Sequence, residues 1–223
     1  MLMARATTQS IDLEARRLLQ EAQGTFQKWP ETFRGFTATL RCTRGPSCAR
    51  GVLRVAPGGG VGVDIADRAL RRTVEAWLRA TSDARTPRFF KDGDGRFPIS
   101  FEQTGDAPAG QRVVRVEGGV TGWRRYWIDE RARIRRHEWL TPERRGVQTF
   151  DGYVRTSPGR ALPTRGDRVE WDVVAEALVE SVIVEEVHCR VEHVWLPRAV
   201  RLTSRRRDAE DVTHVELEQH ALV

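Results

Sequence analysis

The chain has 223 residues, 39% of them apolar and 30% charged, with a formal net charge of +6. A chain of this length buries about 70% of its unfolded surface when it folds, which is enough for a sizeable core. The composition excludes an intrinsically disordered chain. No apolar run reaches the ~18 residues of a membrane span, and residues 1–10 lack the apolar stretch of a secretory signal. We therefore expect a cytoplasmic globular protein without a transmembrane segment.

The positive charge is carried almost entirely by arginine, because Lys28 and Lys91 are the only lysines among the 37 basic residues. Arginine matches the geometry of phosphate groups, so a nucleic-acid partner has to be considered. A phosphate-binding surface concentrates its positive charge, whereas here Asp and Glu alternate with the arginines along the chain. We interpret the bias as codon composition and predict no nucleic-acid partner.

Cysteine and histidine patterns give no sign of a metal site. The three cysteines, Cys42, Cys48 and Cys189, include no CxxC pair, which argues against both a disulfide framework and a thiolate zinc site. Cys42 and Cys48 flank a hairpin-like turn, and whether they pair is left open. His188 and His193 differ by five positions and should face opposite sides of a strand. We predict no metal and, since nucleotide-binding and nucleophile motifs are also absent, no cofactor.

Two amphipathic helices are predicted early in the chain. Apolar residues recur every three or four positions over residues 10–29, with Ser10 as the expected N-cap and Pro30 as the stop. A second helix is predicted over residues 67–82, with Asp67 as its N-cap. Each has one apolar face, so each should lie against a core.

The rest of the chain alternates apolar and polar residues, as strands do. A strand near residue 40 and a hairpin around residue 58 precede the second helix, and mostly strands follow over residues 97–220. The Pro- and Gly-rich segment 156–168 is predicted to be the longest loop. Short turns indicate antiparallel pairing in meander order. We predict an α+β fold in which a curved antiparallel sheet of about 8–11 strands, a half-barrel, wraps around both helices as one domain over residues 1–223.

Polar residues in apolar registers are the candidate catalytic groups. Residues 179–195 are predicted to form one long strand whose apolar face is interrupted by a carboxylate and an imidazole, and a buried carboxylate can serve as an acid or base. Exposure of both side chains through strand twist is the alternative. The strand over residues 132–140 has no clean apolar face, which indicates an inward-facing polar pair. The candidates are Glu185, His193, Arg136, Glu138 and His137.

A second set of residues is predicted to bind a ligand. Most of the seven tryptophans fall on or beside the predicted sheet. Aromatic side chains usually fill cores, and they also line cavities that hold flat or apolar molecules. Interleaved arginines can hold a carboxylate on such a molecule. The candidate ligand-binding residues are Trp123, Arg125, Tyr126, Trp127, Trp139, Phe150, Tyr153 and Trp195.

Short segments along nearly the whole chain resemble a known family. They are Trp29-Pro30, the segment Phe33 to Ala38, Arg136-His137, Thr149-Phe150 and Leu196-Pro197. In order and spacing these segments are similar to an uncharacterised bacterial family, best known from cyanobacteria, that is described only as a domain of unknown function. The chain departs from that family in the turn between Cys42 and Cys48 and in its arginine content.

That family in turn resembles the LolA-like lipoprotein-carrier half-barrels and a violacein-pathway enzyme of the same architecture. The resemblance implies a curved sheet over helices that holds an apolar ligand, or one that rearranges an indole-derived molecule without a cofactor. We predict binding of an apolar or aromatic, anionic small molecule in the half-barrel. The alternative is a cofactor-independent cyclase or rearrangement enzyme of specialised metabolism, and a third possibility is a scaffold or regulator.

Overall fold

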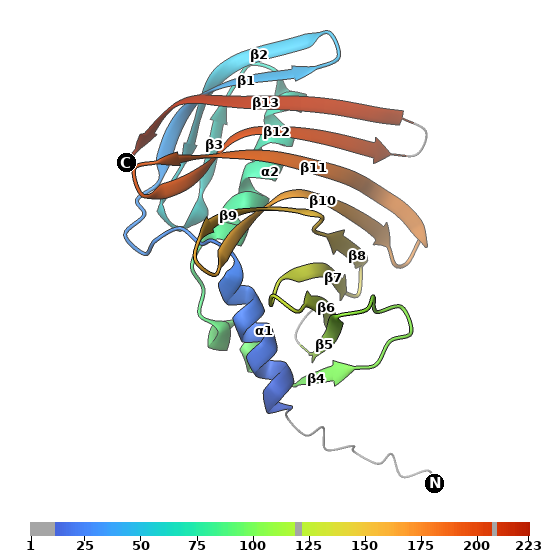
Figure 1. Cartoon of the computed structure of the whole chain (residues 1–223). Coiled ribbons are helices and arrows are strands. Elements are labelled where there is room, and N and C mark those ends of the chain that lie inside the picture. Colours follow the sequence, from blue (N-terminus) through green and yellow to red (C-terminus); the bar gives the residue numbers. More distant parts are fainter. Residues whose placement is uncertain (1–11, 119–121, 207–208) are drawn as a thin grey trace.

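A single curved antiparallel sheet with two helices on its concave side makes up the fold. The computed structural model describes residues 12–118, 122–206 and 209–223. Within them, 13 strands form one unclosed sheet, and Figure 1 shows its long strands curving across the molecule. The predicted α+β half-barrel is confirmed. The strands outnumber the expected eight to eleven, in part because residues that were expected to be a loop belong to β10.

The helices are α1 (Leu13–Thr25) and α2 (Arg68–Arg85), and short 3-10 turns occupy Pro57–Gly59, Phe90–Asp92 and Asp94–Arg96. The strands are β1 (Phe36–Arg44), β2 (Ser47–Val55), β3 (Val61–Asp64), β4 (Ile99–Glu102), β5 (Gln111–Glu117), β6 (Trp123–Asp129), β7 (Ile134–Leu140), β8 (Arg144–Thr149), β9 (Gly152–Ser157), β10 (Arg160–Asp172), β11 (Ala177–Val191), β12 (Val194–Arg206) and β13 (Ala209–Leu222).

The sheet runs in the order β3-β2-β1-β13-β12-β11-β10-β8-β7-β6-β5-β4, and β9 pairs with β10 beside this path. Strands β4 to β13 follow one another as a meander, and β13 pairs with β1. The hairpin of β1 and β2, with β3, therefore extends the sheet beyond β13. Strands β3 and β4 are therefore the two edges, and the segment that joins them, which contains α2, passes from one edge to the other. Both edge strands are short, which limits pairing with other chains.

Both helices begin at aspartate caps. Asp12 accepts hydrogen bonds from the backbone N–H groups of Glu14 and Ala15 at 3.0 Å, so α1 starts at Leu13. The predicted cap, Ser10, lies outside the described residues. The predicted cap of α2, Asp67, is confirmed. In the part of the chain that the structure describes, neither helix is long and apolar enough to cross a membrane.

Each helix buries its apolar face in a separate core. The fully buried residues of α1, among them Leu19, pack with β5 and β6 residues such as Val114. The apolar face of α2, which includes Leu70 and Val74, packs with β1, β2, β12 and β13. Figure 1 shows α2 behind the long strands and α1 beside the short strands β4 to β6. The concave face of the middle strands β8, β10 and β11 is left between the two helices.

Two predicted segments differ from the structure. Residues 156–168, expected to be a loop, form the ends of β9 and β10, because Gly159 adopts a positive φ of 73° and closes a tight turn. The expected long strand over residues 179–195 is interrupted by a turn at Glu192, whose φ is 52°. The two errors are opposite in kind. Proline and glycine in the first segment suggested a long loop where only a two-residue turn separates the strands, whereas the alternating pattern of the second segment concealed such a turn.

The strand register separates the two cysteines of the first hairpin. Cys42 is opposite Ala49 and Thr43 is opposite Cys48, so the two thiols point to opposite faces of the sheet. Cys42 is buried, and this burial raises the pKa of its thiol to about 11. Cys48 is exposed, and both cysteines are free.

A close approach between β2 and β3 provides a test of the fold. A methyl group added at Gly51 would lie 1.9 Å from the backbone oxygen of Asp64, whereas at Gly62 on β3 nothing lies within 4 Å. We expect Gly51→Ala to lower the free energy of unfolding by about 1–3 kcal/mol through overpacking. Gly62→Ala should change it by less than about 0.5 kcal/mol. Urea unfolding followed by tryptophan fluorescence measures both, and equal stability of the two variants would contradict this pairing.

Candidate functional site

A large cavity lies on the concave face between the two helices, with a volume of about 1720 Å³. Its floor is built by β10, β11 and β12 through apolar side chains that include Leu162, Val184 and Leu202. Its walls come from α1 and the segment after it, and from the C-terminal half of α2. Protein sites for small molecules are about 300–1,000 Å³, so this cavity has room for a large ligand.

The wall at α2 holds a buried carboxylate. Glu186 on β11 accepts hydrogen bonds at its Oε1 from Trp77 Nε1 at 2.5 Å and from Thr81 Oγ1 at 3.3 Å. Its other oxygen, Oε2, lies 3.6 Å from His188 Nε2. Glu186 is thus held at Oε1 by two groups of α2, whereas Oε2 has only the longer contact to His188 on its own strand. This carboxylate fixes α2 to the sheet.

A buried arginine and a neutral histidine lie next to it. Arg85 Nη2 lies 3.2 Å from His188 Nδ1, Arg85 Nη1 donates to the Trp195 carbonyl oxygen at 3.2 Å, and His188 Nε2 lies 2.9 Å from the Pro163 carbonyl oxygen. Because arginine only donates, His188 accepts at Nδ1 and donates at Nε2. Burial, and then the charge of Arg85, lower the pKa of His188. Burial also lowers the pKa of Arg85 to about 10, and Glu186 opposes this shift.

At the opposite wall, α1 and β6 meet around a buried aspartate. Asp94 Oδ2 accepts from Tyr126 Oη at 2.8 Å and from Gln23 Nε2 at 2.6 Å, while Arg124 Nη1 lies 2.5 Å from Oδ1. Burial, followed by the charge and hydrogen bond of Asp94, raises the pKa of Tyr126 well above its ordinary value. Asp94 is not among the residues that the sequence predicted for a site. Its role here was missed because the partners lie far away in the chain.

His137 on β7 lies beside Tyr126 and lines the cavity. Its ring stacks on that of Tyr126 with centroids 4.5 Å apart and an angle of 3°, and the ring of Trp139 is 5.2 Å away. Burial, and then the charges of Arg124 and Arg168, lower the pKa of His137 to about 3. His137 is therefore neutral at physiological pH. Its Nε2 is buried and has no hydrogen-bond partner among the described residues.

A polar row continues from His137 across the floor of the cavity. His137 is opposite Gln148 on β8, and Gln148 is opposite Arg168 on β10, so the three side chains share the concave face. Arg168 Nε donates to Glu170 Oε1 at 3.1 Å, and its guanidinium lies 5.6 Å from the ring centroid of Trp139. These contacts hold Arg168 at the edge of the floor.

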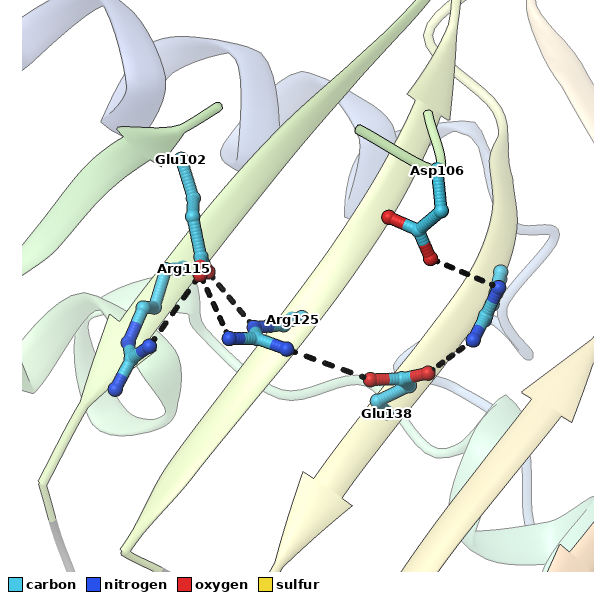
Figure 2. A network of polar contacts seen from close by, with 6 residues as sticks. Glu102, Asp106, Arg115, Arg125 and Glu138 are labelled. Carbon is cyan, nitrogen blue, oxygen red and sulfur yellow. Dashed lines mark hydrogen bonds and ion pairs between the residues drawn. The ribbon is translucent and has the colours of Figure 1, made fainter. Parts of the chain in front are cut away.

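A second polar network covers the opposite, outer face of the sheet (Figure 2). Arg125 donates to both oxygens of Glu102, at 2.7 Å from Nε and 2.6 Å from Nη2, and its Nη1 lies 3.9 Å from Glu138 Oε2. Arg136 Nη2 donates to Glu138 Oε1, and Arg136 Nη1 lies 3.6 Å from Asp106 Oδ2. Glu138 is opposite Arg125 in the register, one position along β7 from His137 and hence on the other face. The network ties the segment between β4 and β5 onto the outer face.

The predicted catalytic residues do not meet in the cavity. Arg136 and Glu138 form the expected pair, with the Glu138 side chain 4% exposed, but on the outer face. Glu185 is also on the outer face, 39% exposed between two arginines, and His193 is 61% exposed at the turn before β12. Only His137 of the five lines the cavity. On β11 the inward register carries Val184 rather than Glu185, and apolar residues on the outer face concealed this.

Among the predicted ligand-binding residues, Tyr126 and Phe150 line the cavity. Trp139 shares the concave face and packs beside His137. The others lie elsewhere. Trp123 and Arg125 contact each other on the outer face, and Trp127 is buried there under Arg136. The hydroxyl of Tyr153 donates to the carbonyl oxygen of Ile134. The backbone carbonyl oxygen of Trp195 accepts a hydrogen bond from Arg85.

Comparison with known proteins gives a family and distant structural relatives. The model of a family described as "Protein of unknown function (DUF3386)" matches residues 10–222. No curated protein matches the sequence. A LolA superfamily protein from Nitrosomonas europaea is 10% identical, with a TM-score of 0.38 over 94% of this chain and 93% of that one. A DUF1329 family protein from Desulfovibrio piger is 7% identical, with a TM-score of 0.34 over 96% and 93% of the two chains.

The low pKa of His137 predicts how stability depends on pH. The folded imidazole binds a proton only near pH 3, whereas the unfolded one binds it below its ordinary pKa of 6.5. Between these values the unfolded state holds more protons, so stability falls as the pH is lowered, by about 1.4 kcal/mol per pH unit for this group. His188 adds a slope of the same sign. In His137→Phe, which can keep the stacking on Tyr126, we expect the slope between about pH 4 and 6 to decrease by about that amount.

Urea unfolding at several pH values measures this slope. His193→Phe, at the exposed turn, is the matched control and should leave the slope unchanged. An unchanged slope in His137→Phe would show that the imidazole is accessible to protons in the folded protein.

The outer network predicts a difference between two carboxylates. Removal of the buried Glu138 takes one partner from Arg125 and Arg136, which are 26% and 35% exposed and keep Glu102 and Asp106, so we expect a cost of about 1–3 kcal/mol. Glu185 meets its arginines at 3.6 Å and 3.9 Å while half-exposed, so its loss should cost less than about 1 kcal/mol. The free energies of unfolding of Glu138→Ala and Glu185→Ala test this. Similar values would mean that Glu138 is solvated.

Proposed function

The chain belongs to the DUF3386 family of proteins of unknown function, and we propose that it binds an apolar or aromatic small molecule with a negative charge in the cavity of its half-barrel. The supporting observation is the uncovered concave face between the two helices. Among the floor residues, Leu162 and Leu202 are buried, whereas Val182 and Val184 on β11 are only partly buried and lie at the edge of the core that α2 covers. An apolar ligand that covers this floor would remove its surface from water, which stabilises the complex by about 25 cal/mol for each Å² buried.

The charges around the cavity favour an anion. Its lining residues include eight basic and six acidic ones, of which Arg165 and Asp167 share the outer-face register. The basic residues are Lys28, Arg44, Arg72, Arg85, Arg88, Arg160, Arg165 and Arg168, and the acidic residues are Glu31, Asp83, Asp167, Glu180, Glu186 and Asp211. A cleft with an excess of one charge raises the local concentration of ligands of the opposite charge. A cavity with an apolar floor and basic residues around it suits an amphiphile with an anionic end.

The enzyme alternative receives no support from these positions. His137 is the only predicted catalytic residue in the cavity, and an imidazole with a pKa of about 3 is a weak base at neutral pH. Glu186, the carboxylate at the α2 wall, is held in place at Oε1 by Trp77 and Thr81 and fixes α2 to the sheet. A binding role needs shape and charge alone, and both are present.

A matched pair of substitutions on β11 tests the proposal. Val184 lines the cavity, whereas Val187 is exposed outside it. We expect Val184→Trp to fill part of the floor and to weaken binding of dodecanoate and of anilinonaphthalene sulfonate at least about tenfold, which corresponds to ~1.4 kcal/mol. Val187→Trp adds the same bulk to the other face and should leave both affinities within about twofold.

Dye fluorescence, and its loss on displacement by dodecanoate, measures the affinities. Native mass spectrometry of the purified protein gives the stoichiometry and reveals any ligand carried through purification. Absence of binding by either probe, or equal weakening by both variants, would contradict a ligand site in the cavity.

A further inference from the structure

We propose that the row His137, Gln148 and Arg168 is the head-group site of this cavity, and that it receives the carboxylate of a ligand whose apolar body lies along β11 and β12. This inference rests on the proposed function and specifies which end of the ligand lies where. Its ligand class is a long-chain or aromatic monocarboxylate.

The first argument is an unsatisfied polar atom. His137 Nε2 is buried and has no hydrogen-bond partner among the described residues, although the ring lines the cavity. Leaving a buried polar group unpaired costs about 1–3 kcal/mol, so native proteins rarely do so without a reason. The ring is held in place by Tyr126, which is itself fixed by Asp94. In the tautomer that carries its proton at Nε2, a rigid, neutral imidazole would be a suitable donor to a ligand oxygen.

The second argument is the alignment of donors across the strands. Gln148 is the register partner of both His137 and Arg168, so it lies between them on the same face. Directly opposed side chains have Cβ atoms about 4.5–5.5 Å apart, so the three groups can reach the oxygens of one carboxylate. All three line the cavity. A neutral imidazole, an amide and a guanidinium together offer donors to both oxygens.

The charge of the row matches a monoanion. The charge of Arg168 is shared with Glu170, which accepts from its Nε and Nη2 groups, so the guanidinium offers a ligand its Nη1 group rather than an unpaired positive charge. Both Arg168 and Arg124 lie close enough to His137 to disfavour its protonation, which shows a positive potential at this point. Since Arg124 is paired with Asp94, this potential suits a single negative charge better than the two of a phosphate monoester.

The position of the row gives the ligand its direction. Arg168 is opposite Val182 on β11, and the neighbouring register positions on the same face carry Val184 and Leu202. The floor thus changes from polar at β7 and β8 to apolar at β11 and β12. A ligand with its carboxylate at Gln148 would lay its apolar body across these strands toward α2.

The test compares two ligands that differ only in the head group. Dodecanoate and dodecanol are titrated by calorimetry into the full chain and into Arg168→Met and Gln148→Leu. We expect Arg168→Met to weaken dodecanoate at least about tenfold, and Gln148→Leu about threefold or more, while dodecanol changes by less than about twofold. Arg201→Met is the matched control, because Arg201 contacts Glu185 on the outer face and should leave both affinities unchanged.

A direct readout comes from the imidazole of His137. Its ¹H–¹³C correlation, assigned by its loss in His137→Phe, should shift when dodecanoate binds and should move much less with dodecanol. This signal reports on the site itself, so it remains informative where one of the variants folds poorly.

Three outcomes would overturn the inference. If both ligands bind equally well and Arg168→Met weakens neither selectively, the cavity binds apolar molecules without this head-group site. If dodecyl phosphate binds at least about tenfold more tightly than dodecanoate, the ligand class is wrong. If neither dodecanoate nor dodecanol binds, the proposed function fails together with the inference.

Discussion

The width of the sheet, compared with that of two helices, is the constraint on which the structure depends. Neighbouring strands are about 4.8 Å apart and a helix is about 10 Å across, so one helix covers about two strands. The sheet path contains 12 strands. Curvature lets each helix contact somewhat more, yet α1 and α2 together complete cores only at the two ends. The cavity is therefore a geometric consequence of covering a broad curved sheet with two helices.

Chain connectivity decides where those helices lie. The chain leaves the edge strand β3, enters α2 on the concave side and re-enters the sheet at the other edge strand, β4. The segment after α1 runs back across the concave side to β1, and Trp29 lies on it. The backbone N–H of Trp29 donates to the carbonyl oxygen of Arg85 at 2.9 Å. Its Nε1 donates to the carbonyl oxygen of Trp195 at 3.2 Å. These bonds join the end of α2 to β12, so the two walls of the cavity are fixed to each other as well as to the floor.

Two apolar periodicities were sufficient to predict the fold class. Spacing of three or four positions predicted both helices, and alternation with short turns predicted the antiparallel strands, because each depends on local sequence. Periodicity was insufficient for the site. The pattern tells that Glu185 and Val184 face opposite sides, but when both faces of a strand carry apolar residues it does not tell which side is concave. The pairing of Arg136 with Glu138 was predictable from their spacing, whereas its location on the outer face depends on how the segment containing Asp106 folds back. Likewise, Asp94 becomes a partner of Tyr126 only through tertiary structure.

The arginine content acquires a different meaning once the residues are placed. On the outer face, arginines such as Arg125 are matched by carboxylates at hydrogen-bond distance, so their charge is neutralised locally and they contribute to folding. Buried atoms without a hydrogen-bond partner occur on both faces of the described sheet, Arg136 Nε and Trp127 Nε1 on the outer one and His137 Nε2 on the concave one, but of these three residues only His137 lines the cavity. Folding alone gives no reason to leave a donor unpaired beside an arginine and above an apolar floor. A ligand that supplies both an anion and an apolar body would satisfy the two surfaces at once, which is why we propose the concave face, rather than the more conspicuous outer network, as the binding side of this sheet.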